Sequence, residues 1–390
     1  MRFRAGLACV LWIPVAWTSL LAAANASEPG GTVAKTAVRE SFKFDTNDLA
    51  VFLPVRVGTK DCQFFLDTGA AVSLFDVSLR SCLGPRVDSI HVATPHGDKL
   101  ELDLYSPPNA RVGSLPLTKD PVLCRDLTPF RDVSGYSVDG IVGVNFLKDW
   151  IITIDFDKGH LDILSPETTA TSDWGEGMPF VWDANGLMCI LATVGKDVCI
   201  PFRIDTGYAN TGMLDATLLS RLVSSSEARV TGDEKALNLS GTHCSSVVRL
   251  SHLSLGSYRH ENLRFTSGEL NILGLNYLSR YRVTIDFPNG RLYLAKGKRF
   301  ADPDRGDNCG LRYLFRAGGL QVESVDERSP ARAADVRAKD VIVKLNGKPV
   351  SERKPSEIGR LLTKEGKTVQ MTVKRDGKLM EMTLTPKEYD

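Results

Sequence analysis

Short runs of alternating or continuous apolar residues, separated by turn-forming residues, recur along most of the chain. Residues 51–57 and 62–66 are two such runs, joined by a Gly-Thr-Lys-Asp turn at 58–61. Residues 187–194 and 198–204 repeat this arrangement around a Gly-Lys-Asp turn. Period-two patterning in short segments bounded by turns predicts β-strands rather than helices. We therefore expect a mainly β protein.

Two further hairpins are predicted at 90–104 and 151–164, and the pattern changes after Phe300. A polar stretch, 302–307, precedes a mixture of strands and a helix at 355–362. The last hairpin turns on Asp-Gly, the strongest short-range hairpin signal. The tail, residues 308–390, is therefore expected to form a small α+β domain.

The central part of the chain contains an internal repeat, which indicates a duplicated domain. Three signals recur in the same order in both copies, and they are Asp-Thr-Gly at 67–69 and 205–207, an apolar-apolar-Gly segment at 141–147 and 272–278, and Thr-Ile-Asp-Phe at 153–156 and 284–287. Many short strands and few helices favour two small β-barrel-like lobes. We expect lobe 1 at 27–168 and lobe 2 at 178–300, with the stretch 166–177 linking them.

The two Asp-Thr-Gly segments are the candidate catalytic residues. Each follows an apolar strand, and each glycine permits a tight turn that places its carboxylate at a loop tip. The threonine can hydrogen-bond across to the other loop. Two facing carboxylates cannot both ionise, so one acts as a base on water while the other polarises a carbonyl. One Asp-Thr-Gly alone could be an ordinary turn, but two in matched frames favour a catalytic pair, Asp67 and Asp205, with supporting loop residues Thr68, Gly69, Ala70, Thr206 and Gly207.

At these residues the chain, from about 42 to 295, resembles the retropepsin and pepsin class of aspartic peptidases. The resemblance implies a bilobal β fold, a cleft for an extended polypeptide substrate, attack by water, and neither metal nor cofactor. Ala70 resembles the retroviral form, and the two short lobes resemble a fused retropepsin dimer.

Several residues depart from that family pattern. Tyr208 stands where a small residue is usual, so it could crowd the cleft or contact substrate. Arg203 lies two residues before the second aspartate, and strand alternation predicts that it points away from the pair. The candidate flap hairpins, around 96–97 and 241–243, lack the tyrosine of pepsin flaps.

The tail resembles a PDZ domain of the bacterial protease-associated type. It contains Gly-Leu-Gln-Val at 319–322, Ser-Pro-Ala at 329–331, and Asp-Val-Ile at 340–342. The resemblance implies a glycine-rich loop, formed by Gly318, Gly319 and Leu320, whose backbone N–H groups bind a peptide C-terminus. Docking of the protein's own lobes is the alternative use of such a domain.

Residues 1–26 have the pattern of a secretory signal peptide: two early arginines, an apolar stretch and Ala-Asn-Ala. An uncleaved anchor is the alternative, but Pro14 interrupts the stretch, so stable membrane insertion is not expected. The mature protein would be exported, either periplasmic or secreted. Cleavage would remove one of eight cysteines, and the odd remainder of seven leaves at least one thiol free or paired between chains.

Composition narrows the remaining possibilities. A net charge of +1 gives no strong field for nucleic acid or an anionic membrane. His-Glu-x-x-His, Walker and Gly-x-Ser-x-Gly motifs are absent, and the six scattered histidines indicate surface positions or ordinary packing. Two hypotheses follow: an exported aspartic endopeptidase whose PDZ domain binds substrates or partners, or a catalytically weak protease fold that serves as a peptide-binding or scaffolding module.

Overall fold

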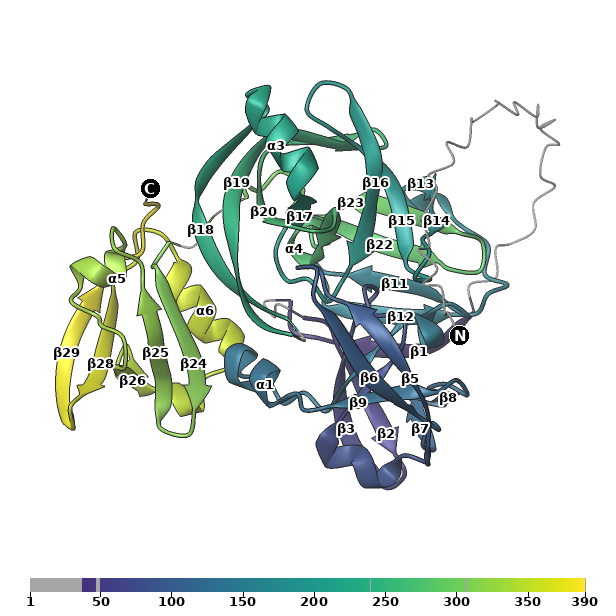
Figure 1. Cartoon of the computed structure of the whole chain (residues 1–390), viewed down its shortest axis with the longest axis horizontal. Helices are drawn as coiled ribbons and strands as arrows, with labels where there is room; N and C mark the ends of the chain where they lie inside the picture. The colour runs from purple at the N-terminus through teal and green to yellow at the C-terminus, as the bar shows by residue number, and fades with distance from the viewer. Residues whose placement is uncertain (1–36, 47–49, 239, 305, 307, 390) are drawn as a thin grey trace, which may run out of the picture. The chain divides into compact units, whose positions relative to one another are not determined.

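The computed structural model describes residues 37–46, 50–238, 240–304, 306 and 308–389. Within these residues the strands form four sheets, and helices are few and short (Figure 1). The predicted fold class is confirmed: two β-rich lobes are followed by a small α+β domain. The expected signal peptide lies outside the described residues.

Lobe 1 is built on one sheet, in which strands from before and after the first Asp-Thr-Gly segment lie side by side. In order across the sheet, its described strands are β5 (Arg86–Ala93), β6 (Lys99–Tyr105), β9 (Val122–Arg125), β4 (Leu74–Asp76), β10 (Gly140–Val142), β3 (Lys60–Leu66), β2 (Phe52–Val57), β7 (Ala110–Val112) and β8 (Leu115–Pro116). Most neighbours are antiparallel, but β10 runs parallel to β3 with Val142 opposite Leu66. This parallel pair brings the apolar-apolar-Gly segment beside the strand that ends at the first Asp-Thr-Gly.

Lobe 2 repeats this plan in a sheet that closes on itself. Its described strands are, in order, β14 (Val181–Trp182), β15 (Met188–Val194), β16 (Val198–Asp205), β21 (Ile272–Gly274), β17 (Gly212–Asp215), β20 (Tyr258–Gly268), β19 (Gly241–Leu255) and β18 (Ala228–Asn238). A second pairing, of β15 with β19, closes the barrel. Here β21 runs parallel to β16, with Gly274 opposite Asp205.

A third sheet joins the two lobes. Its described strands are, in order, β1 (Val38–Lys43), β12 (His160–Leu164), β11 (Ile151–Asp155), β22 (Tyr281–Asp286), β23 (Arg291–Lys296) and β13 (Glu176–Pro179). The repeated Thr-Ile-Asp segments meet here, because β11 and β22 are antiparallel neighbours (Figure 1) and the hydroxyls of Thr153 and Thr284 lie 3.1 Å apart. One continuous apolar core includes residues of both lobes, among them Phe64 and Phe202. The lobes are therefore held together by backbone pairing as well as by apolar packing.

The expected linker at 166–177 is more ordered than its polar composition predicts. A 3-10 turn at Ser172–Trp174 leads directly into β13, which pairs with β23. Trp174 is buried, and its ring packs edge-on against Tyr293 at 5.2 Å. Burial of this one large aromatic side chain anchors a segment that is otherwise polar.

The helices are local additions to the sheets. Those of the lobes are α1 (Thr128–Ser134), α2 (Val144–Leu147), α3 (Ala216–Ser224) and α4 (Leu275–Leu278), with a 3-10 helix at Val77–Cys82. Asp215 caps α3 by accepting hydrogen bonds from the backbone N–H groups of Thr217 and Leu218. The turns α2 and α4 are the same element in the two repeats, each following the apolar-apolar-Gly segment.

The C-terminal domain has its own sheet and its own apolar core. Its described strands are, in order, β24 (Leu311–Arg316), β25 (Gly319–Val325), β26 (Val341–Leu345), β28 (Val369–Arg375) and β29 (Lys378–Leu384), with β27 (Lys348–Pro349) paired to β26. The helices are α5 (Pro330–Ala333), α6 (Pro355–Thr363) and a 3-10 turn at Val350–Glu352. The expected helix and final hairpin are both present.

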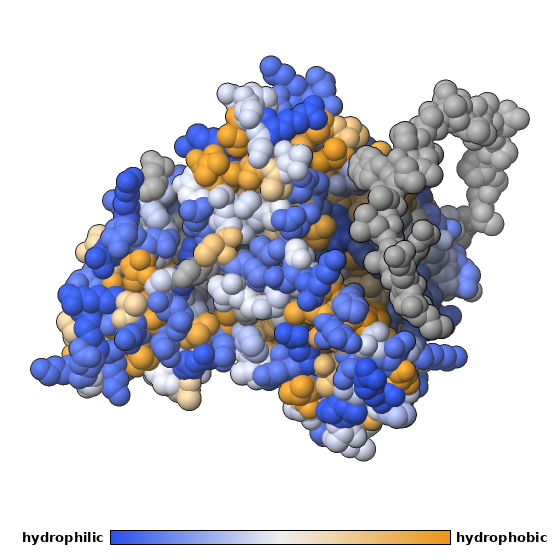
Figure 2. Space-filling model, viewed as in Figure 1, coloured by the Kyte–Doolittle hydropathy of each residue, from blue (hydrophilic) through white to orange (hydrophobic). Residues whose placement is uncertain are grey.

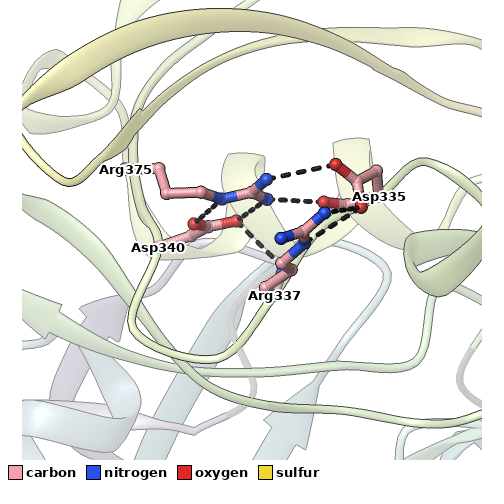
Figure 3. A network of polar contacts seen from close by, with 4 residues as sticks. All are labelled: Asp335, Arg337, Asp340 and Arg375. Carbon is pink, nitrogen blue, oxygen red and sulfur yellow. Dashed lines mark hydrogen bonds and ion pairs between the residues drawn. The ribbon is translucent and has the colours of Figure 1, made fainter.

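A polar network fixes the strand ends of this domain (Figure 3). The Arg375 guanidinium donates two hydrogen bonds of 2.8 Å to the carboxylate of Asp340, which is buried. It also donates to Asp335, which in turn accepts from Arg337. These carboxylates raise the pKa of Arg375, so the guanidinium stays charged and the paired aspartate is not left as an isolated buried charge.

The surface is mainly polar. On the face shown in Figure 2, hydrophilic residues predominate and hydrophobic residues gather in smaller areas. In the described part of the chain, no helix combines the length and apolar character needed to cross a membrane. No disulfide joins any of the described cysteines, which include Cys189 in the lobe 2 core.

Candidate active site

The two Asp-Thr-Gly segments occupy equivalent places in the two lobes. Asp67 follows β3 directly, and its backbone N–H donates to the carbonyl of Val142 at 3.0 Å. Asp205 is the last residue of β16, opposite Gly274 of β21. In each lobe, therefore, the apolar-apolar-Gly segment supports the end of the strand that carries the aspartate.

Two threonines join the loops by four reciprocal hydrogen bonds. The hydroxyl of Thr68 donates to the carbonyl of Ile204 at 2.7 Å and accepts from the backbone N–H of Thr206 at 3.0 Å. The hydroxyl of Thr206 donates to the carbonyl of Leu66 at 2.9 Å and accepts from the N–H of Thr68 at 3.1 Å. Both threonines are buried. The cross-loop bonding that the sequence suggested thus links the lobes directly beneath the two carboxylates.

The carboxylates lie against each other's loops. A Cβ at Gly69 would lie 2.4 Å from Cγ of Asp205, and a Cβ at Gly207 would lie 2.4 Å from Cγ of Asp67. Only glycine therefore leaves room for the opposite carboxyl group at either position. Both aspartates keep partial solvent exposure, so water can reach them.

The two carboxyl groups are electrostatically different. Burial, together with the neighbouring Asp205, raises the pKa of Asp67 well above its usual range. Burial also raises the pKa of Asp205, but the hydrogen bond from the Asp67 side chain opposes that rise, whereas the same bond raises the pKa of Asp67. Two backbone N–H groups lower the pKa in both loops, those of Gly69 and Ala70 for Asp67 and those of Gly207 and Tyr208 for Asp205. The arrangement favours a proton on Asp67 and the negative charge on Asp205.

The unusual residues beside the second loop point away from the pair. The Arg203 guanidinium binds Asp183, with Nε–Oδ2 at 2.8 Å, as strand alternation predicts. The Tyr208 hydroxyl lies 2.6 Å from that of Thr266 in β20, and burial raises the pKa of Tyr208 to about 12. This tyrosine therefore packs within lobe 2.

The two candidate flap hairpins contact each other. His96, in the β5–β6 turn, stacks on His243 of β19 with ring centroids 4.5 Å apart. Asp98 accepts a hydrogen bond of 2.7 Å from the hydroxyl of Ser240 and lies 3.3 Å from Nε2 of His243. On the other side of the pair, Nε2 of His96 lies 3.1 Å from the hydroxyl of Ser245. These two histidines are not merely surface or scattered packing residues, because they form an inter-lobe contact.

A hollow of about 390 Å³ lies beside the first Asp-Thr-Gly loop. Its apolar wall includes Ala71 and Val72, which follow that loop, and Ile90 and Leu104 of the β5–β6 hairpin. At its edge, Lys148 forms an ion pair of 3.3 Å with a neighbouring aspartate. Nothing in the local sequence pattern marks these residues as neighbours.

The residues of the expected peptide-binding loop of the tail lie where strand β25 begins. Gly318 belongs to the tight turn between β24 and β25, and Gly319 and Leu320 already belong to β25. At Leu320 this strand is paired on both sides, with Phe315 and with Ile342. A strand bonded on both edges cannot add a peptide strand there, so β24 rather than β25 lies at the edge of the described sheet. A glycine pair fits a hairpin turn as well as a ligand loop, so the binding role of these residues stays a prediction.

No cluster of His, Cys, Asp or Glu in the described residues has the arrangement of a metal site. Residues 297–385 match the family model of a PDZ domain, so the chain contains one. No curated protein matches the chain. Among solved structures, the crystal structure of aspartic proteinase from Irpex lacteus aligns at a TM-score of 0.43 and 13% identity, covering 70% of this chain and 100% of that one.

Proposed function

We propose that this protein is an exported aspartic endopeptidase whose PDZ domain binds substrates or partners. One observation carries the proposal: two Asp-Thr-Gly loops from a duplicated fold place Asp67 and Asp205 against each other. The four threonine hydrogen bonds fix that approach. Two crowded carboxylates with unequal pKa values are the arrangement that acid–base attack by water requires.

The proposed mechanism gives each carboxyl group a role. Ionised Asp205 accepts a proton from a water molecule, whose oxygen attacks the peptide carbonyl carbon. Protonated Asp67 donates its proton to the carbonyl oxygen, which gives a tetrahedral diol. The C–N bond then breaks as a proton moves to the amine, and the two products are a carboxylic acid and an amine.

Two neighbouring features suit an extended peptide. The hollow beside Ala71 and Val72 has an apolar wall that can accept an apolar substrate side chain. The hairpins that carry His96 and His243 must separate to admit a chain if they cover the cleft, because their tips are in contact. Opening of such hairpins would precede substrate binding.

The test is hydrolysis of a diverse peptide library by the mature protein across a range of pH. We expect turnover that is lost in Asp67→Asn and in Asp205→Asn, with the double variant hardly worse than either, because the two groups act as a unit. A pepstatin-like transition-state mimic should bind the unmodified protein and lose affinity for Asp67→Asn. Substantial turnover in either single variant would exclude the paired mechanism.

Export is proposed on residues 1–26 alone, whose charged, apolar and small-residue regions follow in signal-peptide order. N-terminal sequencing of the protein recovered from the exported fraction tests this. We expect a new N-terminus after the Ala-Asn-Ala site. An intact Met1 in a membrane fraction would instead indicate an anchor.

A second function, peptide binding without efficient catalysis, is favoured by the PDZ match and by the contact between the two hairpins. The same library separates the two functions. Peptide binding that persists in Asp67→Asn, together with no hydrolysis by the unmodified protein, would support the binding module. Peptides with free and amidated C-termini would show whether the PDZ domain recognises the terminal carboxylate.

A further inference from the structure

A second hollow lies in lobe 2, where α4 meets the segment that follows β23. It has a volume of about 310 Å³ and is lined by Asn276, Arg280, Arg299 and residues 302–304. None of these lining residues belongs to an Asp-Thr-Gly loop or to the apolar hollow of lobe 1. Its chemistry is dominated by two guanidinium groups.

Arg280 is a buried cation without an acidic partner. The residue is 4% exposed. One guanidinium nitrogen donates to the backbone carbonyl of Asp302 at 2.6 Å and lies 3.5 Å from that of Phe300. Its Nε is buried and has no hydrogen-bond partner, and no carboxylate of the described residues forms an ion pair with it. Burial of an unpaired charge costs free energy, so an anion bound beside this guanidinium would stabilise the protein.

Arg299 adds a second cation at the mouth of the hollow. Its side chain is about half exposed, at 49%, and it donates to the hydroxyl of Ser279 at 3.0 Å and to the amide oxygen of Asn276 at 3.3 Å. Its contact with Asp302 is only 4.0 Å, and that carboxylate is itself largely exposed. Neutral groups therefore orient the second guanidinium, and no close carboxylate in the described part of the chain neutralises its positive charge, so the charge can attract an anionic ligand.

The other acidic residue of the lining, Asp304, has its hydrogen-bonding capacity directed elsewhere. It accepts from the hydroxyl of Thr211 at 2.7 Å, from the backbone N–H of Arg264 at 2.8 Å and from the amide of Asn276 at 3.1 Å. These three donors satisfy the buried carboxylate without help from Arg280.

The positive field of this region reaches a buried neighbour. Burial, together with the positive charges of Arg280 and Lys296, lowers the pKa of His260 to about 4. An anion beside Arg280 would oppose that field. The histidine therefore provides a probe of the hollow that does not touch the ligand.

We propose that this hollow binds a small oxyanion, a carboxylate or a phosphate, between Arg280 and Arg299. Guanidinium groups bind both anions through paired, charge-assisted N–H···O hydrogen bonds. Arg280 lines the hollow with a guanidinium whose hydrogen bonds go only to backbone carbonyls, and Arg299 supplies donors at its mouth. The ligand is either a free anion or the carboxylate of a peptide, and both share this chemistry.

The experiment measures binding to the full mature chain by calorimetry and thermal unfolding, so its result does not depend on the proposed peptidase activity. The probes are inorganic phosphate, acetate, and one short peptide with a free or an amidated C-terminus, with chloride holding the ionic strength constant. We expect saturable binding of phosphate or of a carboxylate, and a rise in the unfolding temperature with its concentration. Binding of the free but not the amidated peptide would identify a peptide carboxylate as the source, whereas binding of phosphate alone would identify a free anion.

The variants test the assignment of the site. Arg299→Gln, at a half-exposed position, should weaken binding about tenfold through the loss of a charge-assisted hydrogen bond. Arg229→Gln makes the same charge change at an exposed position of β18 and should leave affinity unchanged. Arg280→Lys keeps the charge and should also weaken binding. In the unmodified protein, the bound anion should raise the pKa of His260, which an NMR titration measures. Absence of saturable binding by every probe, or equal weakening by Arg229→Gln and Arg299→Gln, would overturn the proposal.

Discussion

The reciprocal hydrogen bonds of Thr68 and Thr206 beneath the carboxylates should contribute more to the free energy of unfolding than the hydroxyl contact of Thr153 with Thr284, which also joins the lobes. Replacement of Thr68 by Val keeps the shape and removes the hydroxyl. The change deletes a donor bond to the Ile204 carbonyl and leaves the backbone N–H of Thr206 without its hydroxyl acceptor. Two buried hydrogen bonds lost, one of them leaving an unsatisfied donor, correspond to roughly 2–4 kcal/mol of unfolding free energy.

Urea unfolding, extrapolated linearly to water, measures this loss. The matched control is Thr153→Val, which removes one hydroxyl–hydroxyl contact of 3.1 Å with Thr284 in the sheet between the lobes. That contact is also buried and also joins the two lobes, but it lies in a different sheet from the aspartates, so we expect a loss of only about 1 kcal/mol and unchanged peptide turnover. Thr68→Ser should stay close to the unmodified protein in both measurements. If Thr68→Val cost no more than Thr153→Val and kept full turnover, the threonines would not be holding the pair together.

Three further predictions concern titration. Replacing Arg203 by Met removes a positive charge that lowers the pKa of Asp205, so the acid limb of the pH–rate profile should move to higher pH; an unmoved limb would contradict that influence. Because the pKa of Asp67 is raised on folding, its ionisation lowers the free energy of unfolding as pH rises through that pKa. Asp67→Asn cannot ionise, so its free energy of unfolding, measured in urea, should exceed that of the unmodified protein by more at pH 8 than at pH 4. Burial and the neighbouring His243 lower the pKa of His96, so the stacked contact should weaken as pH falls below the ordinary histidine range, and His243→Gln should raise that pKa in an NMR titration; an unchanged pKa would contradict the coupling.

The lobes and their Asp-Thr-Gly loops could be predicted because their signals are local and repeated. Alternation within β2, β3, β15 and β16 identifies strands, and a turn glycine after each aspartate identifies a loop tip. The repeat then adds what local patterns lack, because two equivalent loops related by duplication are expected to face one another. The close approach of each glycine to the opposite aspartate, at Gly69 and Gly207, shows that the two loops do face one another.

The contacts that sequence reasoning missed depend on residues distant in the chain. His96 and His243 stack only because two long hairpins from different lobes meet, and neither hairpin carries a local signal of its partner. The unpaired guanidinium of Arg280 is equally hidden, since the sequence shows an arginine in a basic stretch but not its burial. The local signal at Gly318 fits both a hairpin turn and a ligand loop, so its role in peptide binding stays a prediction.

Duplication alone would produce two equivalent carboxylates with no preferred position for the shared proton. The two lobes have diverged at the residue two places before each aspartate, which is buried Phe65 in lobe 1 and Arg203 in lobe 2. The hydrogen bond from the Asp67 side chain favours a negative charge on Asp205, and the guanidinium acts in the same direction. Asp67 has an apolar neighbour in place of that cation, and so it retains the proton more readily. The repeat thus brings the pair together, while this difference between its copies favours the proton on Asp67 and the negative charge on Asp205.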